Sequence, residues 1–270
     1  MKKKGVILTG ISVLIIGMII VSVSFNIKSN DVATTIVTVD INPSVKIFLD
    51  KKEKVISAKA MNNDAETISY DHIIGIDVGE AIESIVLQAK VAGYIDEDDL
   101  EEDYVLITTV PMNNGRDKTD QVKEKINNRI AYSDELQSVN VAIIKASKVE
   151  MFEAEEKKVP VGLYVVNGKI TVDGEEVPVK EFFSNSKNVD KFKEKGTITK
   201  MKAEKKREQL ERYLLRLKQK GFDISPYQVA INATDSNLDK IISDIKKAVV
   251  ESKKTNKGNS NNSNGKSKKK

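Results

Sequence analysis

The residues most able to do chemistry lie in one short stretch, Asp40-Ile-Asn-Pro-Ser44. The side-chain amide of Asn42 can attack its own backbone carbonyl, form a five-membered succinimide and release Pro43 as a free amine. Proline suits this leaving role because its tertiary amide twists out of plane more easily and its ring fixes the local dihedral angles. Asp40 shares a strand face with Asn42 and can polarise or deprotonate the attacking amide. The stretch therefore predicts a backbone bond that cleaves itself between Asn42 and Pro43.

Two other interpretations of this stretch stay open. Ser44 can attack the carbonyl of Pro43, as in domains that cleave themselves before a serine, and the break then falls one bond later. Asn-Pro is also an ordinary turn dipeptide with no chemistry. A second polar motif, Asn62-Asn-Asp64, either lines the bend or forms a turn that its own side chains close.

Apolar residues alternate on both sides of the proline, which predicts one strand before it and another after it. The apolar face consists of Val37, Val39 and Ile41, then Val45, Ile47 and Leu49. Because Pro43 has no N–H for a ladder, we expect a bend, bulge or edge position at Asn42-Pro43. A charged turn at 50–54 then leads into a third strand at 55–60.

These residues carry a family resemblance. Asp40-Ile-Asn-Pro-Ser44, followed by the segment from Val55 to Asp64, resembles the extracytoplasmic domain of RsgI-type anti-sigma factors of Gram-positive bacteria. In that family a D-I-N-P-S strand precedes a V-x6-N-x-D hairpin. The resemblance covers about residues 34–150 and continues through a helix ending at Gly93-Tyr94 and the strand from Tyr104 to Thr109.

The resemblance implies a juxtamembrane signalling domain. Such a domain cuts its own backbone between the asparagine and the proline while the two pieces stay paired. Removal of the outer piece then lets an intramembrane protease cut the transmembrane helix, and a sigma factor is released inside the cell. Self-cleavage of this kind is a single-turnover event, so we expect no turnover enzyme.

An uncharged run at residues 5–25 follows three lysines. About 20 apolar residues suffice for a helix to cross a bilayer. The preceding lysines place the N-terminus in the cytoplasm and the bulk of the chain outside. A cleaved signal peptide would have a shorter apolar core and a small-residue cleavage site. The sequence therefore predicts a single-pass cell-membrane protein with a cytoplasmic end at 1–4 and a spacer at 26–33. A cytoplasmic end of four residues is too short to bind a sigma factor. The sigma factor is then expected to bind another chain or sequence ahead of this start; otherwise the chain serves another purpose.

The rest of the first domain reads as alternating helices and strands. A helix begins after Asp77, its expected N-cap, and ends at Gly93. A strand at 104–110, a helix at 117–132 and a strand at 139–146 follow. Together with the hairpin they predict an α+β protein whose domain at 34–150 is a small α/β sandwich with helices on one sheet face.

A second, partly helical region is expected at 151–252. The apolar runs and Asn-Gly and Asp-Gly turns at 161–179 predict a short β-meander. Amphipathic helices are predicted at 197–220 and 235–252, and the lysine-rich tail 253–270 is predicted to be disordered.

Composition excludes several classes of function. The chain has no cysteine, so it forms no disulfide, and its single histidine rules out multi-histidine metal sites. The acidic run 96–103 lacks the spaced glycine of a calcium loop and is expected to be a solvated loop. We therefore predict no metal and no cofactor. The net charge of +4 is small and its excess lies at the two ends, which argues against nucleic-acid binding. A basic tail can bind cell-wall polymers, and the alternative function is a non-cleaving, membrane-anchored wall-binding or structural protein.

Overall fold

The computed structural model describes residues 32–97, 99–112, 117–167, 178–232 and 237–259. The predicted membrane span 5–25 lies outside these residues. Among the described helices, none has the length and apolar character that a membrane crossing requires.

A six-stranded sheet with the order β3-β2-β1-β4-β5-β6 forms the centre of the fold. Its strands are β1 (Thr35–Asp40), β2 (Ser44–Leu49), β3 (Val55–Ala60), β4 (Tyr104–Pro111), β5 (Asn140–Lys145) and β6 (Thr197–Thr199). β4 and β5 are parallel and all other neighbours are antiparallel. The strands predicted on both sides of the proline are confirmed, and β1 lies inside the sheet between β2 and β4.

One face of the sheet is covered by α2 (Val78–Val91) and α3 (Thr119–Tyr132), the two helices predicted there from the sequence. The same layer also contains three short elements that were not predicted: α1 (Asn63–Glu66), the 3₁₀ turn η1 (Asp71–Ile73) and α4 (Asp134–Gln137). Asp77 caps α2 as expected, because its Oδ1 accepts a hydrogen bond from Gly79 N at 2.9 Å. Its Oδ2 accepts from Lys125 Nζ at 2.6 Å and so links α2 to α3. Gly93 ends the helix with a φ of +83°.

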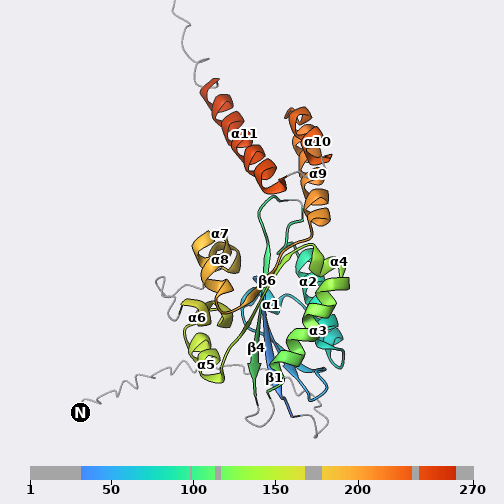
Figure 1. The fold of residues 1–270 in the computed structure, drawn as a ribbon, viewed down its shortest axis with the longest axis vertical. Helices are drawn as coiled ribbons and strands as arrows, with labels where there is room; N and C mark the ends of the chain where they lie inside the picture. The colour runs from blue at the N-terminus through green and yellow to red at the C-terminus, as the bar shows by residue number, and fades with distance from the viewer. Residues whose placement is uncertain (1–31, 98, 113–116, 168–177, 233–236, 260–270) are drawn as a thin grey trace, which may run out of the picture.

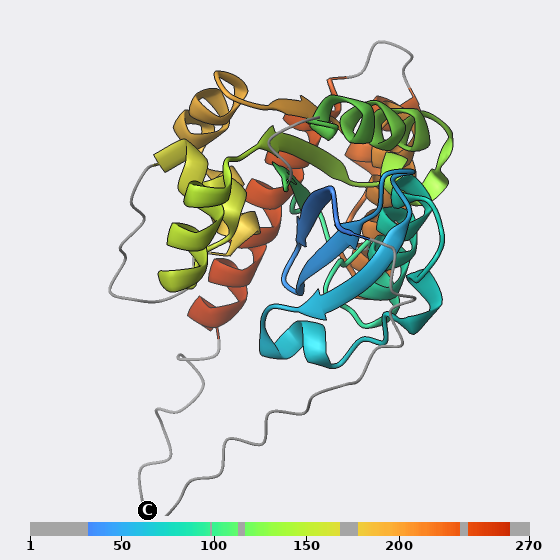
Figure 2. The same ribbon diagram turned by 90° about the horizontal axis from the view of Figure 1, so that it is seen from below.

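The other face is also covered, by helices that follow β5 and lie almost entirely in the region 151–252, which the sequence predicted as separate from the domain at 34–150. The second layer consists of α5 (Lys148–Glu156), α6 (Val161–Asn167), α7 (Val179–Ser184) and α8 (Ser186–Lys193) (Figures 1 and 2). The core between this second layer and the sheet includes Ile36 of β1, Leu106 of β4 and Ile144 of β5. These side chains lie on the sheet face opposite the first layer. Because β4 and β5 carry apolar side chains on both faces, both faces need a cover.

The segment 161–167 is a helix, where the sequence predicted the first strand of a meander. A short apolar run does not distinguish a strand from a buried helix. Here Tyr164 N donates to Pro160 O at 3.0 Å and closes the first turn. Gly162 lets α6 approach the sheet, since a Cβ there would lie 2.8 Å from Thr108 Oγ1. Most of the predicted meander, 168–177, lies outside the described residues, and Val179 begins a helix.

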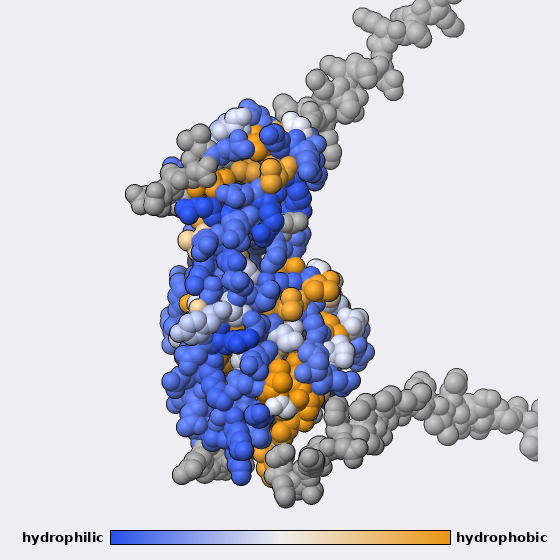
Figure 3. Space-filling view, turned by 90° about the vertical axis from the view of Figure 1, so that its right-hand side faces the viewer, coloured by the Kyte–Doolittle hydropathy of each residue, from blue (hydrophilic) through white to orange (hydrophobic). Residues whose placement is uncertain are grey.

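The C-terminal part contains α9 (Ala203–Gln219), α10 (Ser225–Asn232) and α11 (Leu238–Asn259), which pack together beyond one end of the sheet (Figure 1). The helix predicted at 197–220 begins later, because residues 197–199 pair with β5 as β6. The last helix continues to Asn259, so the first part of the tail predicted as disordered is helical. No proline interrupts it there. Hydrophilic side chains dominate the face of the molecule seen in Figure 3.

Candidate functional site at the Asn42-Pro43 bend

The chain reverses direction completely at the Asn-Pro bond. Asp40 at the end of β1 pairs with Ser44 at the start of β2, so residues 41–43 make the whole turn. Ile41 N donates to Pro43 O at 2.9 Å across it. Asn42 has a backbone φ of +84°, a value that residues other than glycine seldom adopt because of its steric cost. The expected bend is therefore a strained hairpin turn between two buried strands, with Asn42 exposed and Pro43 buried.

Asn62 holds both sides of this turn. Its Oδ1 accepts from Ser44 N at 3.1 Å and from Ala65 N at 3.0 Å, which caps α1. Its Nδ2 donates to Asn42 Oδ1 at 3.1 Å. Both interpretations of the Asn62-Asn-Asp64 motif thus hold for Asn62, which closes a local turn and also lines the bend.

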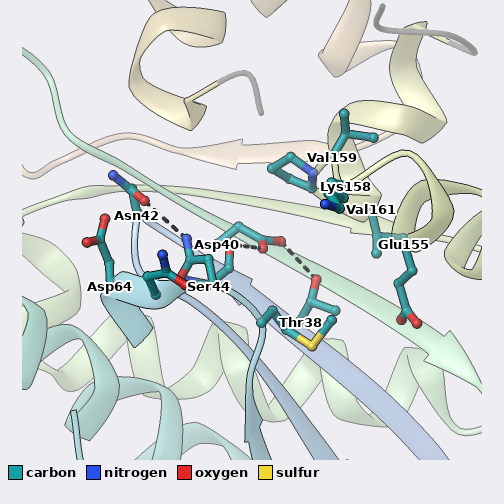
Figure 4. A pocket seen from close by; sticks show the side chains of 13 residues that line it. Thr38, Asp40, Asn42, Ser44, Asp64, Glu155, Lys158, Val159 and Val161 are labelled. Atoms are coloured by element: carbon teal, nitrogen blue, oxygen red, sulfur yellow. Dashed lines mark hydrogen bonds between the residues drawn. The ribbon is translucent and has the colours of Figure 1, made fainter. Parts of the chain in front are cut away.

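Asp40 and Ser44 meet beneath the bend. The Asp40 side chain is buried, and its Oδ1 accepts from Ser44 Oγ at 2.7 Å. Its Oδ2 accepts from Thr38 Oγ1 at 2.9 Å (Figure 4). All four predicted site residues therefore lie in or beside one turn. A carboxylate next to the serine hydroxyl fits the serine mechanism as well as the asparagine mechanism, so this contact leaves both open.

A cleft of about 560 Å³ opens beside the bend. The bend and Asn62 line one side, and the connection from α5 to α6 lines the other with Glu155, Lys158 and Val161 (Figure 4). Sequence reasoning missed this second wall because it predicted a β-meander after residue 160.

A buried ion pair near the cleft was also missed. Lys46 of β2 is only 6% exposed and its ammonium group pairs with the Glu155 carboxylate of α5. The alternation that placed Asp40 on the polar face also puts Ser44 and Lys46 there, across the turn. That shared face was the available signal for a polar site extending along both strands.

Part of the acidic run is structural rather than solvated. Glu102 Oε2 and Oε1 accept from Lys200 Nζ at 2.8 Å and Lys206 Nζ at 2.9 Å. Burial alone would raise the pKa of Glu102, but the two lysines outweigh it and hold that pKa at about 2. Burial raises the pKa of Asp103, against the opposing effect of Lys180 at 3.1 Å. Among the described residues, no group of three histidine, cysteine or acidic side chains is placed to hold a metal ion.

Comparison with known proteins decides the family. Residues 34–169, just over half of the chain, match the anti-sigma factor RsgI-like central domain. The chain belongs to this family. The match includes the bend, the two strands that flank it, and both α5 and α6. It extends past residue 150, where the resemblance had been expected to end.

Several anti-sigma-I factors of Acetivibrio thermocellus are similar to this RsgI-like chain. RsgI7 is 30% identical over 124 residues, which cover 46% of this chain and 22% of that protein. RsgI4 is 23% identical over 153 residues, covering 56% of this chain and 29% of that protein. RsgI9 is 32% identical over 100 residues, which cover 37% of this chain and 14% of that protein. The chain therefore spans less than a third of the length of these relatives.

Proposed function

We propose that this RsgI-like chain is a membrane-anchored, extracytoplasmic signalling module whose central domain cleaves itself between Asn42 and Pro43. The observation that carries the proposal is the geometry of the turn. Asn42 is held at a φ of +84° in a three-residue reversal, and Asn62 hydrogen-bonds its side chain. Strain of this kind persists only where the surrounding structure enforces it, and it is common at functional sites.

The step that breaks the backbone needs only groups that the turn supplies. Asn42 Nδ2 bonds to the carbonyl carbon of Asn42, and the bond from that carbon to the Pro43 nitrogen breaks. One Nδ2 proton is lost and the Pro43 nitrogen gains one. The buried Asp40 carboxylate, which accepts from Ser44 at the end of the turn, is the proposed carrier of this proton. Water then opens the succinimide. The fixed approach of the amide supplies the entropic advantage of an intramolecular reaction.

The cut strand stays in place because β1 pairs with β2 on one side and with β4 on the other. Loss of a central strand removes the cooperative core of the sheet, so its release acts as an all-or-none switch. We propose that residues 5–25 anchor the chain in the cell membrane with the bulk outside. Removal of the outer piece then exposes the anchor to an intramembrane protease. A sigma-factor system is the partner that the family supports.

The test is the mass of the purified full-length chain under denaturing conditions. Wild type should give two fragments that meet at Asn42 and Pro43, while Asn42→Ala should stay intact and Ser44→Ala should still be cut. A break between Pro43 and Ser44 would instead support the serine mechanism. An intact wild-type chain that is folded by circular dichroism would refute self-cleavage. It would favour an anchored protein that binds cell-wall polymers through its basic tail.

A further inference from the structure

We propose that Asn62 is a positioning residue for the cleavage, holding the Asn42 amide in the orientation that attack requires. This inference rests on the proposed self-cleavage. Its first support is that the Asn62 amide bridges the bond that breaks. Asn62 Oδ1 accepts from the N–H of Ser44, immediately after Pro43, and its Nδ2 donates to the side chain of Asn42, immediately before it.

Asn62 is itself held firmly. Its Oδ1 also accepts from Ala65 N at 3.0 Å as the N-cap of α1. The preceding residue, Met61, donates from its backbone N–H to Ser44 O at 2.9 Å. The start of β2 and the start of α1 therefore fix the Asn62 amide from two directions, and its remaining donor points at Asn42. An asparagine meets this need because one planar amide carries both an acceptor and a donor.

The hydrogen bond to Asn42 acts on the reacting amide in two ways. It fixes Oδ1 of Asn42, and because the amide is planar it also fixes the nitrogen that must attack. It withdraws charge toward Oδ1, which favours loss of the Nδ2 proton as the new bond forms. Asn62 touches the reacting side chain without exchanging atoms with it, so its effect is on orientation and proton loss.

A single substitution can remove the hydrogen-bond donor of Asn62 and keep its acceptor. Asn62→Asp keeps an oxygen for Ser44 N and Ala65 N but replaces the donor to Asn42 with a second oxygen. At neutral pH that carboxylate cannot donate. When it is protonated, its O–H can again donate to Asn42 Oδ1. A merely structural role would give the opposite response, since protonation of this carboxylate weakens the cap of α1.

The experiment follows cleavage of the full-length chain, made by pulse-labelled cell-free translation with lipid nanodiscs and then shifted to buffers between about pH 2 and 7. The variants are Asn62→Asp, Asn62→Ala and the control Asn63→Asp, which adds the same charge on an exposed neighbouring side chain. We expect Asn62→Asp to cleave about tenfold more slowly than wild type at pH 7, the cost of one hydrogen bond. Its rate relative to wild type should recover several-fold as pH falls through the pKa of the new carboxyl group. The N–H donors of Ser44 and Ala65 hold that pKa below the reference value of about 3.9, so the recovery comes at the acidic end of the range. The relative rate of Asn62→Ala should stay low at every pH.

The possible failures are distinguishable. Wild type that stays intact would refute self-cleavage, and the positioning role with it. Wild type that is cut, beside an Asn62→Asp variant that is cut equally fast at every pH, would refute the positioning role alone. So would a low, flat relative rate for Asn62→Asp, or an equal slowing in Asn63→Asp. If Asn62→Ala fails to fold, the pH response of Asn62→Asp still decides, because that variant retains the cap of α1.

Discussion

The proposed retention of β1 after self-cleavage can be tested at Val39. This side chain is fully buried and lies between Val45 of β2 and Ile107 of β4 in the sheet register. We expect Val39→Ala to speed the loss of the outer fragment from the cleaved protein without changing the position of the cut. The reason is that a noncovalent strand is held only by its ladders and by the side chains that it buries.

The magnitude follows from the buried side chains of β1 and the turn. Four aliphatic side chains are buried there: Ile36, Val37, Val39 and Ile41. At roughly 1.5–3 kcal/mol each they contribute about 6–12 kcal/mol, comparable with the estimated 4–15 kcal/mol cost of holding two separate pieces together. Removing two methyl groups from Val39 costs about 2–3 kcal/mol, transfer and cavity terms together. That loss corresponds to roughly 30- to 150-fold weaker retention, since about 1.4 kcal/mol is a factor of ten.

The assay immobilises cleaved full-length protein through an N-terminal tag in detergent and measures the rate at which the outer fragment leaves. Val149→Ala is the matched control, because it makes the same chemical change at a side chain that is 65% exposed on α5. Its release rate should stay close to that of wild type. Equal release from Val39→Ala and Val149→Ala would refute the argument that burial of β1 holds the two pieces together.

Three further predictions concern the layers around the site. Glu155→Gln should lower the free energy of unfolding by about 1–3 kcal/mol in urea titrations, because it leaves the buried Lys46 ammonium group without its charged partner. The loss is limited because the Glu155 side chain is itself 28% exposed. The lowered pKa of Glu102 makes its ion pairs stabilising above its unfolded pKa of about 4.3, and that stability is lost as pH falls toward about 2. Thermal midpoints at pH 5 and pH 2.5 should therefore differ less in Glu102→Gln than in wild type. Gly162→Ala should destabilise the protein by about 1–3 kcal/mol, since its Cβ would lie within 2.9 Å of Leu106 and Ile144; an unchanged urea midpoint would contradict the close packing of α6.

The first domain was predictable because its signals are local. Alternation of β-branched residues placed β1 and β2, the capping residue Asp77 marked the start of α2, and Gly93 marked its end. The segment after residue 150 was not predictable in the same way. The run at 161–166 has no charged or amide side chain, and the helix that it forms packs on β4 and β5, which lie far away in the sequence. Likewise β6 is a strand because β5 offers it an edge.

The candidate residues of the site lie close together in the sequence, but the side chain that holds them comes from elsewhere in the chain. Asp40, Asn42, Pro43 and Ser44 are contiguous or nearly so, and their residue types alone suggest the reaction. The role of Asn62 depends on β3 returning beside β2, which brings it within 3.1 Å of Asn42. A local motif thus indicates a reaction, while the residues that orient the reacting groups come from pairing between strands.

The polar face of the hairpin shows why burial changes the meaning of a sequence pattern. Alternation alone suggests that Thr38 and Asp40 face solvent, yet both are buried under the second helical layer. A buried polar group without a partner is costly, so such a face persists only where its members bond one another. Thr38 and Ser44 donate to Asp40, and Lys46 pairs with Glu155. The buried space directly beneath the Asn-Pro turn is thus filled by polar contacts, although apolar residues would pack there more simply. A connected polar set in that place is what a reaction at the turn requires.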